Sequence, residues 1–492
     1  MNFIEIKKHP KEACINSFKE FILNNFDYYT ILKLGSTGQL TTNYLRGIAW
    51  KIFLGVLNKD ESLDKWKLNL TYLRTEYKII SDKVIKQQNY IEETDKQKLG
   101  YSNDIKTSLL KTKSIVNNPF KPEKETKELI NLDLSRTFQE LSLFHDEKIK
   151  NKLSHILFVW SKENSDVGYQ QGMNDILSII FLALYPYYFK NENINDKKDI
   201  INAKSLYLFF HDEDEFESDL YICFDKAMKK GIKKFYEFEF EEKEKQDIFI
   251  RSLCLFKEEI KNINEEINTP LNIRCSMIIN EKLKRLDYQL YKHFNEIGLN
   301  CTIFLQRWLK CVFNREFELK NILIIWDAIF SSSNINKEYD LTKIDMIALS
   351  MILRIREFLL LCDQNQCFMI LLQYPRIDDI LELIIFSDKL NEAIIDLLSG
   401  KKSLFLDNIT NFEMNYDFKN DNKDENINKI NEKENNKIKE ISPIKNYEEG
   451  IKRLGNIFIK YHSLMEINDE KEFLNTFYLT ILVRVLIKSK IL

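Results

Sequence analysis

Glycine and proline are both scarce in this chain of 492 residues, which contains 12 glycines and 7 prolines. Average usage of roughly 7% and 5% would give about three times as many of each. Because the tight turns between strands depend on these two residues, their scarcity argues against a sheet-rich fold and favours long helices. Apolar residues make up 44% of the chain, including 34 Phe and 22 Tyr, so a large helical core can form.

An excess of positive charge is also missing. The chain carries 72 Lys and Arg against 75 Asp and Glu, a net charge of −3. A nucleic-acid-binding protein needs a basic surface to neutralise phosphates, and this balance offers none. We therefore expect no nucleic-acid partner.

Motifs for metal binding and for common enzyme chemistry are absent. The eight cysteines form no C-x-x-C pair and the six histidines are isolated, so we predict no zinc site and no nucleophilic catalysis. The acidic stretch HDEDEF at 211–216 reads as the start of a helix or a loop rather than a metal cluster. No G-x-x-x-x-G-K-[ST] sequence occurs, so the chain does not bind a nucleotide through a P-loop.

Long apolar runs are missing too. The N-terminal sequence has no apolar core of signal-peptide length, and no run of 18 apolar residues occurs anywhere. The nearest, FYLTILVRVLI at 477–487, is short and contains Arg484. Scattered cysteines in a chain of this length are typical of small buried residues in a reducing compartment. We expect a soluble, cytoplasmic protein with no transmembrane segment.

Helical periodicity is what the sequence does contain. Apolar residues recur at three- and four-residue spacing in several segments, which predicts an all-α fold of many helices. Thr41, Thr42 or Asn43 is a candidate N-cap for the first of these helices. The clearest segments are 44–57, 152–160, 176–185, 304–313 and 346–361.

Polar stretches interrupt the helical pattern. Residues 190–200 are predicted to be a surface loop, and the charged stretch 233–247 a solvated helix or an insertion. Residues 414–441 are rich in Asn, Lys, Glu and Asp with almost no apolar pattern, which is typical of a disordered linker. Helical periodicity returns over 446–490, where we expect one or two helices.

Two short stretches contain polar residues that packing does not explain. In INLDLSRTFQELSLF (130–144), Ile130, Leu134 and Phe138 define a buried helix face, and Asp133 and Arg136 fall on a face turned away from it. In GYQQGMNDIL (168–177), two glutamines lie between two glycines. Local sequence leaves open whether the arginine simply pairs with Asp133 and whether a glutamine caps a helix.

These stretches recur in a known combination. Four motifs follow one another along the chain: RGIAW with FLG (46–55), I-x-x-D-x-x-R-T (130–137), Y-x-Q-G (169–172) and RW…REF…WD (307–327). Their order resembles that of the TBC domain of Rab GTPase-activating proteins. Within that family, the segment MILRIREFLLLCDQNQCFMILLQYP is most similar to the branch of TBC domain family member five. The resemblance covers roughly residues 41–398 and implies an all-α TBC domain.

The resemblance implies a mechanism in which two side chains enter the active site of a bound Rab. By this likeness Arg136 is an arginine finger and Gln171 a glutamine finger, while Asp133 orients the arginine region. A guanidinium presents fixed, always-charged donors to the charge that develops as GTP is cleaved. The glutamine amide can align the attacking water, and the neighbouring glycines let the backbone turn so that its side chain projects. The implied supporting residues are Thr137, Tyr169 and Gly172, and those that hold the fold or shape the groove are Arg46, Gly47, Trp50, Trp308, Arg315, Glu316, Trp326 and Asp327.

One position departs from the family pattern. The family usually has proline two residues after the motif threonine, and Gln139 stands there in this chain. Proline would stiffen the backbone after the arginine, so its loss is expected to affect the rate more than the presence of activity.

The expected organisation has four parts: an N-terminal helical extension (1–40), the TBC domain (41–398), a linker (399–445) and a C-terminal helical segment (446–492). The protein would need no cofactor of its own, because the Rab carries GTP and Mg²⁺. A Rab and endosomal coat or trafficking complexes are the implied partners, with peripheral recruitment to endomembranes. The alternatives are a TBC scaffold that binds Rabs or coat complexes with little catalysis, and a plain helical adaptor without a GTPase partner.

Overall fold

The computed structural model describes residues 4–99, 123–190, 203–240, 242–254, 269–332 and 341–400. Within these ranges the regular structure is helical, with two isolated β-bridges, Ile4 with Leu141 and Phe189 with Asp212. The all-α prediction is therefore confirmed for the part of the chain that is described.

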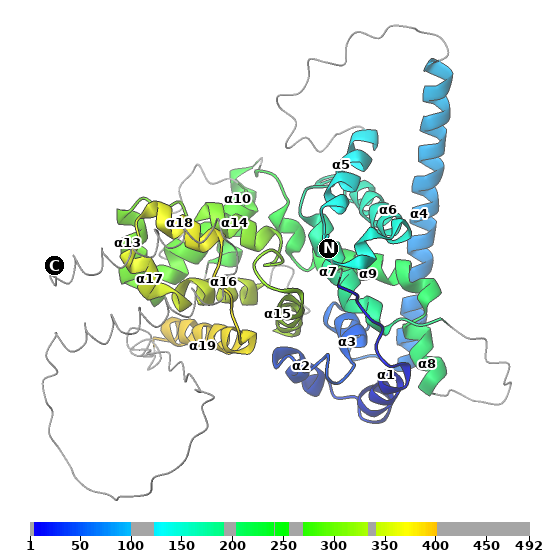
Figure 1. The fold of residues 1–492 in the computed structure, drawn as a ribbon, viewed down its shortest axis with the longest axis horizontal. Helices are drawn as coiled ribbons and strands as arrows, with labels where there is room; N and C mark the ends of the chain where they lie inside the picture. Colours follow the sequence, from blue (N-terminus) through cyan, green and yellow to red (C-terminus); the bar gives the residue numbers. More distant parts are fainter. Residues whose placement is uncertain are drawn as a thin grey trace, which may run out of the picture.

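The helices form two groups joined side by side (Figure 1). The first group, on the right of the figure, contains α1 (Lys11–Phe18), α3 (Arg46–Phe53), α4 (Leu63–Leu99), α5 (Glu123–Ser135), α6 (Glu147–Glu163), α7 (Met173–Leu184), α8 (Ala203–Phe210) and α9 (Phe216–Lys229). The second group contains α10 (Lys243–Leu253), α11 (Pro270–Met277), α12 (Lys284–Leu286), α13 (Tyr288–Glu296), α14 (Thr302–Lys310), α16 (Thr342–Arg354), α17 (Arg356–Leu361), α18 (Gln364–Leu372) and α19 (Ile380–Leu398). Helices α2 (Tyr28–Ser36) and α15 (Leu319–Ser332) lie between them.

Helix α7 is the centre of the first group. Every one of its residues is buried, as its continuous apolar sequence predicts, and it packs against α6 and α9. The long helix α4 runs along the outer edge of the molecule and packs against α6 and α9 (Figure 1). A rigid, fully enclosed α7 gives the segment directly before it a fixed base.

Helix α15 connects the two groups through the tryptophan motifs. Trp50 of α3 stacks on Trp326 of α15 at 5.9 Å between ring centroids. Arg46 donates to both carboxylate oxygens of the fully buried Asp327 at 2.7–3.1 Å, and Trp50 Nε1 donates to the same carboxylate at 2.7 Å. A Cβ added at Gly47 would lie 2.9 Å from Tyr187, so only glycine lets α3 approach this closely. These contacts join α3 to α15, and the fold-holding role implied by the resemblance stays a prediction.

Several predicted helices are confirmed with different ends. The helix expected over 44–57 is α3, and its N-cap, Leu45, makes no capping bond through its side chain. Thr42 and Asn43 instead donate to the carbonyl of Gln39, so the predicted cap was wrong. The helix expected over 346–361 is two helices, α16 and α17, separated at Ile355.

Positive backbone angles explain two further differences. The helix expected over 304–313 ends at Lys310, because Val312 and Phe313 have φ angles of 45° and 61°. Phe138 likewise has a φ of 44° and lies beyond the end of α5, so it does not continue that helix. Both interruptions form turns that reach the pocket described below.

The charged stretch 233–247 is also more buried than expected. It begins in the 3-10 helix η5 (Ile232–Phe235) and ends in α10, and the intervening Tyr236 is only 1% exposed. The prediction of a solvated helix is therefore wrong for its first residues. The stretch 211–216 is confirmed as a short helical start to α9.

The N-terminal residues pack into the two groups. Helix α2 lies against α15, and α1 lies against α8. The four-part organisation stays a prediction. The loop expected at 190–200 lies outside the described residues except for Lys190, as do the linker and C-terminal helices expected at 414–441 and 446–490.

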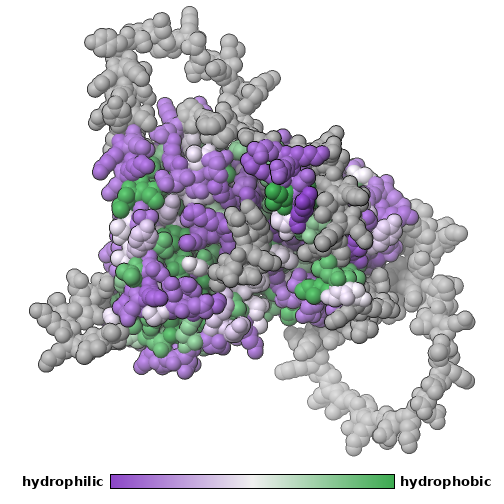
Figure 2. All heavy atoms as spheres, turned by 180° about the vertical axis from the view of Figure 1, so that it is seen from behind, coloured by the Kyte–Doolittle hydropathy of each residue, from purple (hydrophilic) through white to green (hydrophobic). Residues whose placement is uncertain are grey.

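On the face shown in Figure 2, the described residues are mostly hydrophilic, with smaller apolar patches between them. Leu68, Tyr72 and Ile79 of α4 are 60–70% exposed. Single apolar side chains on a surface are ordinary. Among the described helices, none has the length and apolar content needed to cross a bilayer.

Candidate functional site

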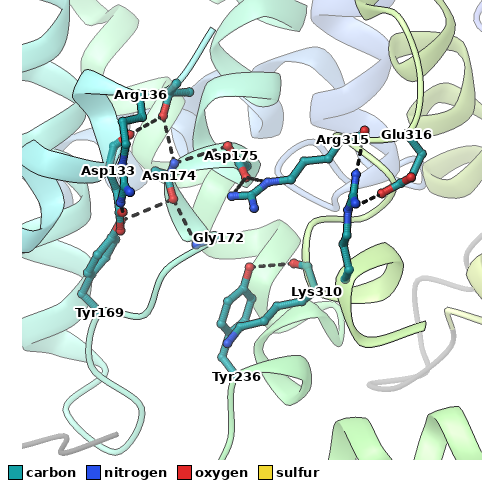
Figure 3. Close-up of polar contacts among 12 residues, drawn as sticks. Asp133, Arg136, Tyr169, Gly172, Asn174, Asp175, Tyr236, Lys310, Arg315 and Glu316 are labelled. Carbon is teal, nitrogen blue, oxygen red and sulfur yellow. Dashed lines mark hydrogen bonds and ion pairs between the residues drawn. The ribbon is translucent and has the colours of Figure 1, made fainter. Parts of the chain in front are cut away.

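A polar pocket of about 390 Å³ lies where the two groups meet. Three segments form it: the turn that ends α5, the start of α7, and the turn after α14 (Figure 3). Its lining residues are Asp133, Arg136, Thr137, Phe138, Glu140, Gln171, Asn174, Asp175, Asn314 and Arg315. The pocket thus brings together both candidate fingers.

We call residues 133–139 the arginine turn. The side chain of Arg136 is 55% exposed, and its Nη2 donates to Asp133 Oδ1 at 2.6 Å. Its backbone N–H donates to the carbonyl of Asp133 at 3.1 Å, which closes the end of α5. The pairing with Asp133 that local sequence left open therefore exists, and it leaves more than half of the arginine side chain open to the pocket.

Asp133 is buried, contrary to the prediction that it faces away from the core. It is 2% exposed, and its second carboxylate oxygen accepts a hydrogen bond of 2.9 Å from the hydroxyl of Tyr169. Burial, and then the adjacent Asp133 carboxylate, raise the pKa of Tyr169 well above its usual value, so the phenol remains a donor. Asp133 consequently binds both Arg136 and Tyr169.

Asn174 links the arginine turn directly to the residues that precede α7. Its side-chain oxygen accepts from the backbone N–H of Gly172 at 3.0 Å, and its side-chain nitrogen donates to Thr137 Oγ1 at 2.9 Å. Thr137 in turn donates to the carbonyl of Asp133 at 2.8 Å. The supporting residues Thr137, Tyr169 and Gly172 are thus held in one network (Figure 3).

Asn174 and Asp175 also belong to the pocket, although no motif pointed to them. Both are buried at the first turn of α7, which is otherwise apolar apart from Ser178. The available signal for them was a pair of adjacent polar residues at the start of an otherwise apolar helix, because buried polar groups require hydrogen-bond partners.

We call residues 168–172 the glutamine turn. Gly168 and Gly172 have φ angles of 64° and 107°, which confirms that the backbone turns at both glycines. Gln171 is exposed at the pocket, whereas Gln170 is half-buried and hydrogen-bonded. Gly172 is the N-cap of α7 and no side chain caps this helix, so the alternative in which Gln171 is a cap is wrong.

Arg315 faces the same pocket from the second group of helices. Its side chain is 44% exposed, and Nε and Nη2 lie 3.0 and 2.9 Å from Asp175 Oδ2. Burial raises the pKa of Asp175, and the Arg315 guanidinium partly opposes this shift. Arg315 therefore joins the two sides of the pocket.

The turn that carries Arg315 is supported from behind. Trp326 Nε1 donates to the carbonyl of Val312 at 3.1 Å, and Trp308 is fully buried under the turn. Glu316 lies 2.9 Å from Arg307 Nε, and burial raises its pKa to about 7. These contacts place Trp308, Glu316 and Trp326 behind the turn; their role stays a prediction.

Gln139, in the place of the usual proline, is held by hydrogen bonds. Its side-chain nitrogen donates to the carbonyl of Ser135 at 3.1 Å, and His145 Nε2 donates to its carbonyl at 2.8 Å. Two hydrogen bonds therefore hold the turn after Arg136, where the family usually has the rigid ring of a proline. No His, Cys, Asp or Glu cluster suited to a metal ion occurs among the described residues.

The fold and this pocket define the class of protein. The family model described as the Rab-GTPase-TBC domain matches residues 43–275 and 255–360, and the chain belongs to that family. The resemblance read from the motifs is thus confirmed.

Two curated relatives are similar over most of this chain. TBC1 domain family member 5 from Mus musculus is 28% identical over 387 residues, which cover 76% of this chain and 44% of the relative. The protein of the same name from Homo sapiens is also 28% identical, with 76% and 45% covered. The chain therefore spans less than half the length of these relatives.

A solved structure shares the fold. The crystal structure of the Ypt/Rab-GAP domain of Gyp1p superposes with a TM-score of 0.51 and 18% identity, covering 80% of this chain and all of that one. A third curated relative is similar over a shorter stretch. The GTPase-activating protein GYP1 from Saccharomyces cerevisiae is 23% identical over 219 residues, which cover 44% of this chain and 29% of the relative.

Proposed function

We propose that this protein accelerates GTP hydrolysis by a Rab-family GTPase. The observation that carries the proposal is the arrangement of Arg136 and Gln171, whose side chains are exposed at one pocket. The residues beside them, Thr137 and Gly172, are held by buried hydrogen bonds. Groups that are fixed before the partner arrives lose little entropy when the reaction begins.

The two side chains have separate tasks in this proposal. Arg136 exchanges its bond to Asp133 for the charge that develops on the transferring phosphoryl group. An arginine finger of this kind contributes about 10³- to 10⁵-fold in rate. Gln171 accepts a hydrogen bond from the attacking water and donates another, which aligns the water for in-line attack. The GTPase brings GTP and Mg²⁺, so this chain supplies side chains only.

The same proposal implies a cellular role for this protein. A Rab regulator of this type would act in vesicle and endosomal membrane traffic, with peripheral recruitment from the cytoplasm. This placement rests on the motif resemblance to the branch of TBC domain family member five. Endosomal coat or trafficking complexes are the proposed further partners.

A catalytically weak scaffold is the second candidate. The 2.6 Å ion pair between Arg136 and Asp133 favours it, because the arginine is already occupied in the free protein. Single-turnover GTP hydrolysis across a panel of Rabs separates the two. Stimulation of at least one Rab by several orders of magnitude supports the activator, whereas Rab binding without stimulation supports the scaffold. Neither binding nor stimulation would leave a helical adaptor.

A further inference from the structure

The two neighbouring glutamines of the glutamine turn have opposite surroundings. Gln171 is exposed, and its side chain makes no hydrogen bond to a described residue. Gln170 is half-buried: its side-chain nitrogen donates to the backbone carbonyl of Tyr236, and its side-chain oxygen lies 3.5 Å from Lys310 Nζ. The structure therefore distinguishes a free glutamine from an engaged one.

Tyr236 and Lys310 form a connected support for Gln170. The hydroxyl of Tyr236 donates to the backbone carbonyl of Lys310 at 2.7 Å, and the ammonium of Lys310 lies 5.1 Å from the centre of the Tyr236 ring (Figure 3). Burial raises the pKa of Tyr236 well above its usual value, so its hydroxyl remains a donor. Because Lys310 is the last residue of α14, this support belongs partly to the second group of helices.

The glutamine turn also rests against Tyr236 through its backbone. A Cβ at Gly172 would lie 3.0 Å from the Tyr236 hydroxyl, so the turn and the ring are in close contact. On its other side the turn is tied to the arginine turn by the hydrogen bond from Tyr169 to Asp133. Its backbone is therefore held at both ends, and Gln171 lies between the two attachments.

We propose that Gln170 is a positioning residue, whose contacts with Tyr236 and Lys310 hold the glutamine turn so that Gln171 projects toward the partner GTPase. The inference rests on the proposed function and deepens it. Two adjacent side chains of a tight turn point in different directions, so fixing Gln170 inward restricts Gln171 to the outward side. A turn without this contact would present the amide over a wider range of positions, and small displacements of a catalytic group can cost about 10²-fold in rate.

Single-turnover hydrolysis with a Rab that the wild-type protein stimulates tests the proposal. The full chain is compared as wild type, Gln170→Leu, Gln171→Ala and the double variant. Leucine is close to glutamine in size and removes both polar contacts. We expect Gln170→Leu to lower the maximal rate about 10- to 100-fold with little change in KM, and to cause no further loss in the Gln171→Ala background. A residue that only maintains the fold would lower the rate in both backgrounds.

Matched controls separate position from stability. Gln373→Leu alters an exposed glutamine at the end of α18, outside the pocket, and should match wild type. Lys310→Met keeps the aliphatic stem and removes the ammonium, so it should reproduce part of the Gln170→Leu loss even if Gln170→Leu folds poorly. Thermal unfolding of each variant identifies any that is destabilised.

The outcomes separate this inference from the proposed function. If Gln171→Ala is impaired while Gln170→Leu and Lys310→Met turn over at the wild-type rate, the positioning role is wrong and the activator stands. A further loss in the double variant likewise overturns it. If Gln171→Ala is fully active, the glutamine part of the proposed function and the positioning role both fail.

Discussion

The arginine turn and the glutamine turn lie at one pocket but are supported in different ways. Arg136 is held by Asp133, three residues earlier, and the turn closes on α5 through Thr137. In the glutamine turn, the side chain of Gln170 contacts Tyr236 and Lys310, which come from distant parts of the chain. The first support is mostly local, whereas the second requires that the two groups of helices be packed together. Damage to the second group should therefore affect the glutamine more than the arginine.

Removal of Arg136 should have the largest effect. Arg136→Ala is expected to lower stimulated hydrolysis by about 10³-fold or more with Rab binding largely kept, because the finger acts on charge in the transition state. Arg136→Lys should also fail, since an ammonium does not reproduce the guanidinium geometry. The measurement is single-turnover hydrolysis together with Rab affinity. More than a tenth of wild-type turnover in either variant would contradict the assignment.

Removal of Gln171 should be the next largest effect. Replacing the Rab's own water-orienting glutamine with leucine normally preserves the GTP form, but this protein should still stimulate such a Rab if Gln171 supplies the amide. Gln171→Ala should lose about 10²-fold with wild-type Rab. The four combinations of wild-type and glutamine-lacking partners are compared. An inert leucine Rab together with a fully active Gln171→Ala would make Gln171 structural.

Asn174 is where the two turns meet, so its loss should weaken both. Asn174→Ala removes the acceptor of the Gly172 N–H and the donor to Thr137, and buried groups left unpaired cost about 1–3 kcal/mol each. Chemical denaturation should show that loss, and hydrolysis should fall for Rabs with and without their own glutamine. Asn280→Ala, which removes a bond to Ser276 far from the pocket, is the control. Equal stability of the two variants would rule out the linking role.

A smaller effect is expected from pH, and it belongs to the turn after α14. Burial raises the pKa of Glu316 from its usual 4.5 to about 7, so the folded protein holds this proton more tightly than the unfolded chain does. Its contribution to the free energy of unfolding is then fully present below about pH 4.5 and is lost as the pH rises through about 7, by at most about 3 kcal/mol. Glu316→Gln should make the denaturation midpoint depend less on pH between about 4.5 and 7. If the midpoint of the variant depends on pH as strongly as that of the wild type, Glu316 is not the group responsible.

Truncation should have the smallest effect. A chain that ends at Gly400 keeps both turns and all four motif segments, so it is expected to retain hydrolysis rates within a few-fold of the full chain. Thermal unfolding and single-turnover hydrolysis of the shortened chain test this. A collapsed thermal transition would show that residues after 400 stabilise the domain.

Sequence alone was sufficient for the features that depend on local pattern and motif order. Apolar spacing predicted an all-α fold, the all-round apolar sequence of 176–185 predicted the buried α7, and the motif order indicated the family. The glycines beside the glutamines predicted a turn of the backbone, and Gly168 and Gly172 have the positive φ angles of such a turn. Each of these inferences rests on residues within one segment or on the order of segments.

Tertiary structure decided which polar groups are buried and with what partners. Asp133 was expected on an outer face, but it is enclosed by Tyr169, which lies 36 positions away. Gln170 finds its partners 66 and 140 positions away, and Arg315 reaches Asp175 across 140 positions. Helical periodicity reports only which face of one helix is apolar. The polar contacts form between segments whose positions depend on how the whole core packs, and no local pattern records that packing.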